Sequence, residues 1–391
     1  MARPLRVLHA ISSLDPKAGG PVNALYGLTR QLVRLGVGVR IVATHDTPAP
    51  PDASAFEAAG VGVRLIGPTR GRLQNHPQLK DALREEVAAA DVVHVHAVWE
   101  SIQHHAAAAA RAAGKPYLMR PCGMLDPWSL SQNRLAKKIL LAWRVKRDFD
   151  RAAAVHYTTA DEQRLAAPVG IRAPGIVEPN GLDPDEIAAL PPRGAWRAAE
   201  GIDPAAPLVA YLGRLHPKKG PDVLIGALAA MKTPGAQLVL IGPGEADYLR
   251  SLEALAAELG VAGRVRFLGM RRGRDRFAPL VDCDVYALPS QQENFGVSVV
   301  EAMVAGLPVL ISPGVNLAPD VIAAGLGEVV PLEATANAAA LDRWLADAPR
   351  RAQAGARAAA YACEHFVWDQ IAARWAGHYE RLRAGLGPSP A

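Results

Sequence analysis

The N-terminal part of the chain alternates short apolar runs, rich in Val, Ile and Leu, with longer runs of helical periodicity. Each apolar run has the length of a buried strand, and glycine or proline often follows it. Strands that alternate with helices predict a parallel, doubly wound sheet, because parallel strands need a crossover connection. The expected strands span residues 5–11, 39–44, 63–68, 91–97 and 115–121. The expected helices span residues 23–36, 77–90 and 102–113.

A stretch rich in proline and glycine, residues 168–194, interrupts this pattern and predicts an inter-domain linker. A second series of strands and helices starts at Pro207, and 391 residues suit two domains of ordinary size. We therefore predict an α/β fold of two Rossmann-like, doubly wound domains, over residues 1–178 and 179–365. Residues 366–391 are treated as a third, C-terminal segment, in which a helix is expected.

Composition and charge limit the class of protein. Hydrophobic residues make up 50% of the chain and charged residues 21%, which argues against disorder. A formal charge of +5 tolerates a nucleoside diphosphate or an anionic membrane surface without demonstrating either, and no nucleic-acid partner is expected. Three cysteines, far apart, favour a reducing, cytoplasmic location over a disulfide framework or a zinc site. No run of 18 apolar residues predicts a spanning helix, and the early His9 and Asp15 do not fit a signal peptide.

The stretch 284–312 fits a strand, a polar loop, a helix and a second strand. Glu293 lies in the loop, and Glu301 lies one turn into the helix. The start of a helix presents free N–H groups, and carboxylates accept hydrogen bonds from sugar or ribose hydroxyls. On shape alone, a plain βαβ unit with two solvated glutamates is the commoner structure.

Cations and glycines stand after two other expected strands. Arg214 and Lys219 follow the first strand of the second domain and could neutralise a diphosphate group. Gly19 and Gly20 precede the first helix, where glycine lets the backbone approach a phosphate. Taken singly, ordinary surface charge is the commoner explanation of the two cations, and a tight turn is the commoner explanation of the two glycines.

Together, these residues resemble conserved motifs of glycosyltransferase family 4. The donor-sugar motif is matched by Glu293 and Glu301 with seven residues between them, by Phe295-Gly296 after the first and by Ala302-Met303 after the second. The diphosphate-binding pair is matched by Gly213-Arg214-Leu215 and Lys219-Gly220, and the glycine-rich first loop by Gly19 and Gly20.

The resemblance implies the GT-B arrangement, in which two Rossmann-like domains face a central cleft. It also implies retaining transfer of a hexosyl group from a nucleoside diphosphate sugar to an acceptor hydroxyl, without a metal ion. The residues implied in catalysis are Glu293, Arg214 and Lys219. Those implied in binding the nucleotide sugar are Gly19, Gly20, Gly244, Leu268, Asn294, Phe295, Gly296, Val297 and Glu301.

The acceptor side is expected in the apolar loop after the strand at 115–121, with Cys122, Met124 and Trp128 as its residues. This loop resembles that of bacterial enzymes that build surface polysaccharides, which suggests a lipid-linked oligosaccharide as acceptor. Cys122 stands where the family usually has a histidine, and this departure leaves the catalytic layout open there.

A basic helix over residues 133–148 follows this loop. Leu135, Ile139 and Trp143 recur every four residues as one apolar stripe. Five cations surround it: Lys137, Lys138, Arg144, Lys146 and Arg147. Such a helix can hold the protein peripherally on an anionic membrane. An ordinary surface helix docked by its stripe is the equal alternative.

Two other functions share this architecture. A nucleotide-sugar 2-epimerase would need paired acid/base carboxylates or histidines in the cleft. A non-catalytic bilobal sugar-binding protein would need export and no diphosphate-binding cations. Gly242 and Gly244 lack the third glycine of a dinucleotide fingerprint, which argues against a nicotinamide cofactor.

Four further patterns have structural interpretations. Asp282-Cys283-Asp284 has the spacing of a metal-binding Asp pair, but we interpret it as a helix-to-strand turn. His94 and His96 lie on one face of a strand and are expected to be hydrogen-bonded core residues. Residues 364–383 predict one long amphipathic helix, which resembles the terminal helix of the family that crosses back to the first domain. Pro179-Asn180-Gly181 resembles the hinge turn of the family.

Overall fold

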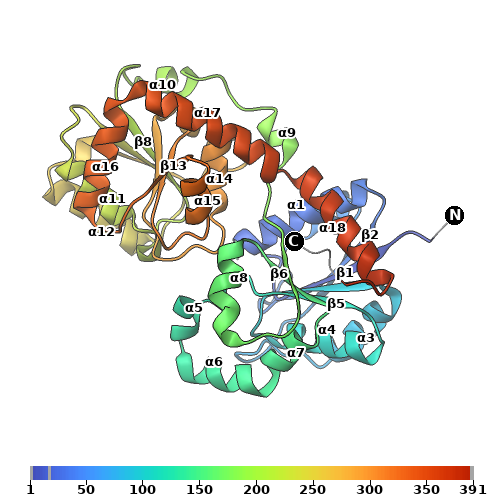
Figure 1. The fold of residues 1–391 in the computed structure, drawn as a ribbon. Coiled ribbons are helices and arrows are strands. Elements are labelled where there is room, and N and C mark those ends of the chain that lie inside the picture. The colour runs from blue at the N-terminus through green and yellow to red at the C-terminus, as the bar shows by residue number, and fades with distance from the viewer. Residues whose placement is uncertain (1–2, 16–18, 388–391) are drawn as a thin grey trace. The chain divides into compact units, whose positions relative to one another are not determined.

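The computed structural model describes residues 3–15 and 19–387. The chain divides into two units, of which the first comprises Met1–Gly181 and Trp368–Ala391 and the second Leu182–Val367 (Figure 1). The boundaries therefore lie at Leu182 and Trp368, where the sequence suggested 179 and 366. Each unit contains one parallel sheet covered by helices on both faces, as the alternating pattern predicted.

The first unit has, within its described residues, a seven-stranded parallel sheet in the order β3-β2-β1-β4-β5-β6-β7. Strand β1 pairs with β2 on one side and β4 on the other, so that His9 lies opposite both Ile41 and His94. The strands are β1 (Arg6–Ile11), β2 (Gly38–Thr44), β3 (Gly62–Ile66), β4 (Val92–His96), β5 (Tyr117–Arg120), β6 (Ala154–Tyr157) and β7 (Gly175–Val177).

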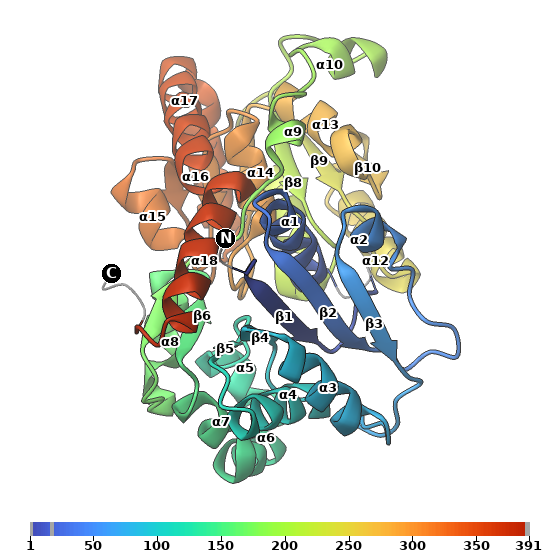
Figure 2. The ribbon, with the colours of Figure 1, turned by 90° about the vertical axis from the view of Figure 1, so that its right-hand side faces the viewer.

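Two apolar cores lie on the two faces of this sheet. On one face, helices α1, α2 and α18 pack against alternate strand residues such as Val7 and Ile41. On the other, α3, α4 and α7 pack against Leu8 and Val42 (Figure 2). The helices are α1 (Gly20–Arg34), α2 (Ser54–Ala58), α3 (Leu79–Ala89), α4 (Ser101–Ala112), α5 (Pro127–Ser131), α6 (Arg134–Leu140), α7 (Lys146–Asp150), α8 (Ala160–Ala166) and α18 (Trp368–Arg383). A π-helical turn, Leu141–Val145, joins α6 to α7.

The second unit has a six-stranded parallel sheet in the order β10-β9-β8-β11-β12-β13, again counted over described residues. The strands are β8 (Leu208–Leu212), β9 (Gln237–Ile241), β10 (Val265–Gly269), β11 (Val285–Leu288), β12 (Val309–Ile311) and β13 (Gly327–Val329). The residues of the four inner strands, β9, β8, β11 and β12, are almost all apolar and buried, as in parallel strands covered on both faces, whereas the edge strands β10 and β13 are half-buried.

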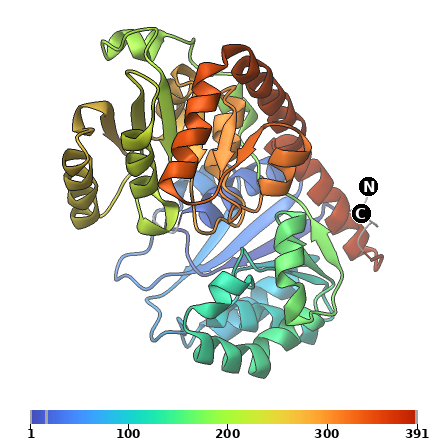
Figure 3. The ribbon, with the colours of Figure 1, turned by 60° about the vertical axis from the view of Figure 1, so that its left-hand side comes forward.

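Helices cover both faces of the second sheet. Helices α11 and α16 lie side by side (Figure 3), and α17 packs against α14. The helices are α9 (Pro184–Ile187), α10 (Ala195–Ala199), α11 (Pro221–Ala230), α12 (Ala246–Glu258), α13 (Phe277–Asp282), α14 (Val297–Val304), α15 (Ala318–Ala323), α16 (Ala334–Ala346) and α17 (Ala348–His365).

Strand order reverses between β1 and β4 in the first unit and between β8 and β11 in the second. Ligands of doubly wound folds bind at the carboxyl ends of the strands at such a switch point. The loops that leave these strands carry Gly19 and Gly20 after β1, Arg214 and Lys219 after β8, and Glu293 after β11.

Two expectations about the chain's organisation were wrong. The stretch 168–194 is not all linker, because Gly175–Val177 forms edge strand β7, which pairs with β6. Residues 364–383 are not one helix, since α17 ends at His365 and α18 begins at Trp368. Between them, Val367 makes a parallel bridge with Leu182, and the N–H of Leu182 donates to the carbonyl of Phe366 at 2.8 Å.

Candidate functional site

The loop between β11 and α14 is tightly fixed to the second unit. Gly296 takes a left-handed conformation, with φ of 79°, immediately before the helix, where a residue with a Cβ would be strained. Phe295 is buried edge-on against Phe366, and their ring centroids are 5.5 Å apart. Asn294 and Val297 are half-buried beside them. The loop thus presents the start of α14 in one defined conformation.

Glu293 is held by its backbone and by its side chain. Its N–H donates to the carbonyl of Gly314 at 2.8 Å, and its own carbonyl accepts from the N–H of Asn316 at 3.0 Å. Its carboxylate oxygen Oε1 lies 2.7 Å from Nζ of Lys219 and 3.2 Å from Oγ of Ser290. Two residues predicted to act together, one after β8 and one after β11, therefore meet in space.

Arg214 stands beside this pair at the carboxyl end of β8. Its backbone carbonyl accepts a hydrogen bond from the hydroxyl of Tyr211 at 2.9 Å, which fixes the start of the loop. Its side chain is exposed and makes no hydrogen bond or ion pair with any described residue. A Cβ placed on the preceding Gly213 would lie 3.6 Å from Cδ of Lys219, so the two cationic segments adjoin. This arrangement leaves the guanidinium of Arg214 available to an anionic ligand.

Glu301 lies on the buried side of α14, and its carboxylate has a partner that the sequence reasoning missed. Nε of Arg276 donates to Oε1 of Glu301 at 2.6 Å. Burial raises the pKa of the Glu301 carboxyl, and the charge of Arg276 acts in the opposite direction. Arg276 lies in an arginine-rich run, 271–276, that has no periodicity, and only the tertiary fold brings it to α14.

The remaining donor-side residues lie in different surroundings. Gly19, with φ of 82°, immediately precedes α1 and Gly20 is its first residue, and a Cβ at either would meet none of the described residues within 4 Å. The three residues before Gly19 lie outside the described part of the chain. Gly244 is closely packed instead, because a Cβ there would lie 3.0 Å from Cβ of Leu215. Leu268 is half-buried near the end of β10.

The acceptor-side residues follow β5. Cys122 has a left-handed backbone, with φ of 52°, and burial raises the pKa of its thiol, so the thiol is protonated at neutral pH. The next N–H, of Gly123, donates at 2.6 Å to the buried carboxylate of Glu162. Met124 is half-buried, and Trp128 is exposed at the start of α5. The three side chains therefore do not share one enclosed environment.

The basic helix is confirmed, but its stripe is not docked. The exposed fractions of Leu135, Ile139 and Trp143 are 74%, 58% and 71%. The helix is held to the unit instead by Val145, at the end of the π-helical turn, and by Phe149 in α7, both of which are buried. The alternative of a helix docked by its stripe is therefore wrong.

Only some of the expected cations face solvent freely. Arg144 is buried and donates to the carbonyl of Trp99 at 2.7 Å, and Lys146 pairs with Asp150 at 3.1 Å. Lys137 donates to the carbonyl of Ser129 at 2.6 Å. Lys138 and Arg147 are exposed, and neither has a partner among the described residues.

Asp282 and Asp284 have structural partners. The Asp282 carboxylate accepts from the backbone N–H of Arg197 at 2.8 Å, and Asp284 pairs with the side chain of the same arginine at 3.0 Å. Asp282 ends α13 and β11 begins at Val285, so the predicted helix-to-strand turn is confirmed.

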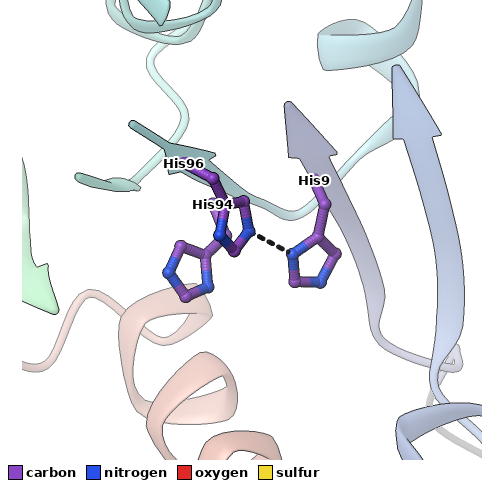
Figure 4. A group of neighbouring side chains, drawn as sticks. All are labelled: His9, His94 and His96. Carbon is purple, nitrogen blue, oxygen red and sulfur yellow. Dashed lines mark hydrogen bonds between the residues drawn. The ribbon is translucent and has the colours of Figure 1, made fainter. Parts of the chain in front are cut away.

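A cluster of histidines lies in the core of the first unit, under α18 (Figure 4). Nδ1 of His9 is 2.9 Å from Nε2 of His96, and Nδ1 of His94 is 2.7 Å from the hydroxyl of Tyr379. His156 extends this series of hydrogen bonds. Its Nδ1 lies 3.2 Å from Nε2 of His94, and its Nε2 lies 2.8 Å from the carbonyl of Glu178.

The hydrogen bonds fix the protonation of this cluster. A carbonyl only accepts, so Nε2 of His156 carries a proton, Nδ1 of His156 accepts from Nε2 of His94, and Nδ1 of His94 accepts from Tyr379. Burial lowers the pKa of all four histidines, that of His9 to about 3, and Arg120 acts in the same direction. The cluster is therefore neutral at pH 7.

Nitrogen atoms of His9, His94 and His96 lie within 4.8 Å of one another, a spacing that could suit a metal ion. Both nitrogens of His94 are already engaged, and the charge of Arg120 opposes a second cation there. Nε2 of His9 and Nδ1 of His96, which should be held by hydrogen bonds in a metal site, have none. We therefore describe the cluster as a hydrogen-bonded core network, as expected for His94.

Comparison with known proteins supports the class of enzyme that the sequence motifs suggested, a glycosyltransferase. The family model described as "Glycosyl transferase 4-like domain" matches residues 19–181, and "Glycosyl transferases group 1" matches residues 192–361. The D-inositol 3-phosphate glycosyltransferase of Stackebrandtia nassauensis is 30% identical over 93% of this chain and 86% of its own length. That of Mycolicibacterium gilvum is 30% identical over 83% of this chain and 80% of its own. The chain belongs to the group 1 glycosyl transferases.

This glycosyltransferase also shares its fold with solved structures. Anabaena HepE in complex with UDP and glucose superposes with a TM-score of 0.75, at 23% identity, over 95% of this chain and 98% of its own. Sucrose-phosphate synthase from Thermosynechococcus elongatus gives 0.76, at 22% identity, over 97% of this chain and 100% of its own. The expected enzyme class and the two Rossmann-like domains of GT-B enzymes are thus confirmed.

No helix of the described residues is both long and apolar enough to cross a membrane.

Proposed function

We propose that this glycosyltransferase takes a hexosyl group from a nucleoside diphosphate sugar and transfers it, with retention, to an acceptor hydroxyl. The observation that carries the proposal is the group formed by Glu293, Lys219 and Arg214 at the switch point of the second sheet. It combines a carboxylate for sugar hydroxyls with two cations for a diphosphate, at the place where doubly wound folds bind ligands.

The residues would divide the reaction between them as follows. Arg214 and Lys219 neutralise the charge that develops on the diphosphate as its bond to the sugar breaks. Glu293 and the N–H groups at the start of α14 hold the sugar hydroxyls, and Glu301 holds the ribose. The acceptor oxygen forms the new bond on the face that the diphosphate leaves, and its proton passes to the departing phosphate oxygen. Gly19 and Gly20 offer an open backbone to the phosphates, and we propose that no metal ion is required.

The acceptor has two candidates. The exposed apolar stripe on α6 and the π-helical turn supports a lipid-linked oligosaccharide, reached from the surface of an anionic membrane. The curated relatives are named for D-inositol 3-phosphate, which supports a small phosphorylated acceptor instead. The stripe favours the first, because three large apolar side chains on one face of a helix cost free energy in water.

Donor binding and turnover test the proposal. A panel of UDP-, GDP- and ADP-sugars in a thermal-shift assay identifies the donor, and mass spectrometry with both acceptor types measures transfer. We expect Glu301→Ala to weaken nucleotide binding and Glu293→Ala mainly to lower turnover. Glu253→Ala, on the exposed side of α12, is the control.

Two results would contradict the proposal. Wild-type affinity and rate in both Glu293→Ala and Glu301→Ala would remove these residues from the donor site. Release of a free epimerised sugar, without transfer to any acceptor, would indicate the 2-epimerase instead.

A further inference from the structure

Arg276 lies between two carboxylates and is fixed on every side. Its Nη2 donates to Oε2 of Glu186 at 2.7 Å, while Nε donates to Oε1 of Glu301 at 2.6 Å. Its Nη1 donates to the carbonyl of Gly273 at 2.6 Å and lies 3.1 Å from Oε1 of Glu186. The guanidinium also lies over the ring of Phe277, 4.6 Å from its centroid. Only 16% of the Arg276 side chain is exposed.

These contacts leave Arg276 unable to turn towards a bound phosphate without breaking several hydrogen bonds. Each of its nitrogen atoms already donates to a group of the protein. Its role is therefore separate from that of Arg214, which has no such partners and faces solvent.

The same contacts determine what Glu301 can offer. Arg276 occupies Oε1, and Oε2 has no hydrogen-bond partner among the residues that the structure describes. A carboxylate with one oxygen held and the other free presents a directed acceptor. An ionised carboxylate accepts hydrogen bonds at both oxygens, whereas a protonated one would lose part of that capacity.

The ionised state of Glu301 depends on Arg276. Burial favours the neutral form of this carboxyl, and the nearby charge of Glu186 acts in the same direction. Arg276 is the first of the groups that oppose them, through both its charge and its hydrogen bond. Without Arg276, only the smaller effect of the Lys219 charge would oppose burial and Glu186, so the pKa of Glu301 would rise further.

We propose that Arg276 is a positioning residue of the donor site, which keeps Glu301 ionised and directs its free oxygen Oε2 towards a hydroxyl of the nucleotide ribose. Glu186, on the first helix of the second unit, fixes the orientation of Arg276. The inference rests on the proposed donor site, because it presumes that Glu301 binds the ribose.

The test compares a ribonucleoside diphosphate with its 2′-deoxy and 3′-deoxy forms by calorimetry, from pH 6.5 to pH 9. UDP and GDP serve as probes, whichever binds more tightly. In the wild-type protein, we expect at least one deoxy form to bind about tenfold more weakly at every pH, as for the loss of one hydrogen bond to a charged group.

In Arg276→Gln, we expect this discrimination between the ribonucleotide and its deoxy form to disappear at pH 6.5 and to return as the pH is raised. The sign follows from the pKa of Glu301, which rises when the cation is removed, so that a higher pH is needed to ionise the carboxyl. If Arg276 only supported the fold, its substitution would weaken binding of both nucleotides, and raising the pH would not restore the preference for the ribonucleotide.

Arg276→Lys keeps the proposal testable if the glutamine variant does not fold. A lysine retains the charge but cannot hold Glu186 and Glu301 in the same forked arrangement. We expect weaker binding with discrimination still present at pH 6.5. The matched control is Arg343→Gln, which removes an arginine paired with Glu328 at 2.6 Å in the same unit and should behave as wild type.

A misplaced donor site and a mistaken role of Arg276 would give different results. If Glu301→Gln leaves both affinity and discrimination unchanged, the donor site is wrongly placed, and this inference fails with it. If Glu301→Gln abolishes discrimination while both Arg276 variants keep wild-type affinity and discrimination at every pH, the donor site stands and the role of Arg276 is refuted.

Discussion

Acidification is expected to destabilise the first unit through its buried histidines. The pKa of His9 falls from 6.5 in the unfolded chain to about 3 in the folded protein. Between these values the unfolded chain binds a proton that the folded protein does not, so stability falls as the pH drops from about 6.5 towards 3. His94, His96 and His156 act in the same direction, because burial lowers the pKa of each.

The contribution of His9 can be worked out from its pKa. At 1.36 kcal/mol for each pKa unit, His9 alone removes about 2 kcal/mol of unfolding free energy between pH 7 and pH 5. This is a sizeable part of the 5–15 kcal/mol that typically stabilises a domain, roughly a fifth of the middle of that range. The neighbouring Tyr379 keeps its proton over this interval, because burial raises the pKa of its hydroxyl well above the usual range.

Urea unfolding at pH 7, 6 and 5, followed by circular dichroism, measures the effect. We expect a loss of about 2 kcal/mol or more between pH 7 and pH 5, since His9 alone accounts for that amount. In His9→Gln, the slope between pH 7 and pH 5 should flatten by about 1 kcal/mol for each pH unit, because His9 contributes about 2 kcal/mol over these two units. His76→Gln, at a partly exposed histidine of the same unit, should keep the wild-type slope. Equal unfolding free energies at pH 7 and pH 5, or equal slopes in wild type and His9→Gln, would refute the reasoning.

Three other predictions follow from the fold and the proposed site. In Gly27→Ala, the new Cβ would lie 2.0 Å from Nε1 of the buried Trp368, so calorimetry should show a loss of about 1–3 kcal/mol of unfolding free energy. Gly377→Ala on α18, where a Cβ would meet none of the described residues within 4 Å, should be neutral or stabilising. Replacing Leu135 and Trp143 by Ser should abolish sedimentation with liposomes of anionic lipid. Reversing the charge of Lys138 and Arg147 should weaken liposome binding by about 1 kcal/mol for each cation removed. Liposome binding that is unchanged in both variants would contradict the membrane proposal. Transfer should persist in excess EDTA, and a loss of activity that Mg²⁺ or Mn²⁺ restores would contradict metal independence.

Local pattern was sufficient for most strands, which are short apolar runs followed by glycine or proline, and for α14, which lies between Gly296 and Gly306. It was also sufficient for the basic helix, whose apolar residues recur every four positions. It failed at β7, where Gly175 and the preceding Pro174 read as linker although the edge of a sheet tolerates both. It failed again at Phe366 and Val367, where a β-bridge between Val367 and Leu182 separates α17 from α18 although the amphipathic sequence pattern continues across both residues.

The pairing of residues far apart in the chain was predictable only through a known motif. Lys219 and Glu293 could be brought together because family resemblance assigns both to one ligand, and the structure places them 2.7 Å apart. Arg276 belongs to no such motif, and nothing local distinguishes it from the other arginines of 271–276. Its partners, Glu186 and Glu301, are found only when α9, α13 and α14 are packed together.

The place of α18 in the first unit has a consequence for how the protein is made. Trp368, Trp375 and Tyr379 fill the core on one face of the first sheet, yet they lie within the last 24 residues of the chain, which the ribosome adds after the entire second unit. Throughout synthesis of residues 182–367, that face of the sheet lacks its covering helix and exposes apolar strand residues and histidines to water or to chaperones. The second unit, which is continuous in sequence, can complete its core first. Premature termination anywhere after residue 181 would therefore leave a first unit with an open apolar face, a natural substrate for quality-control proteases.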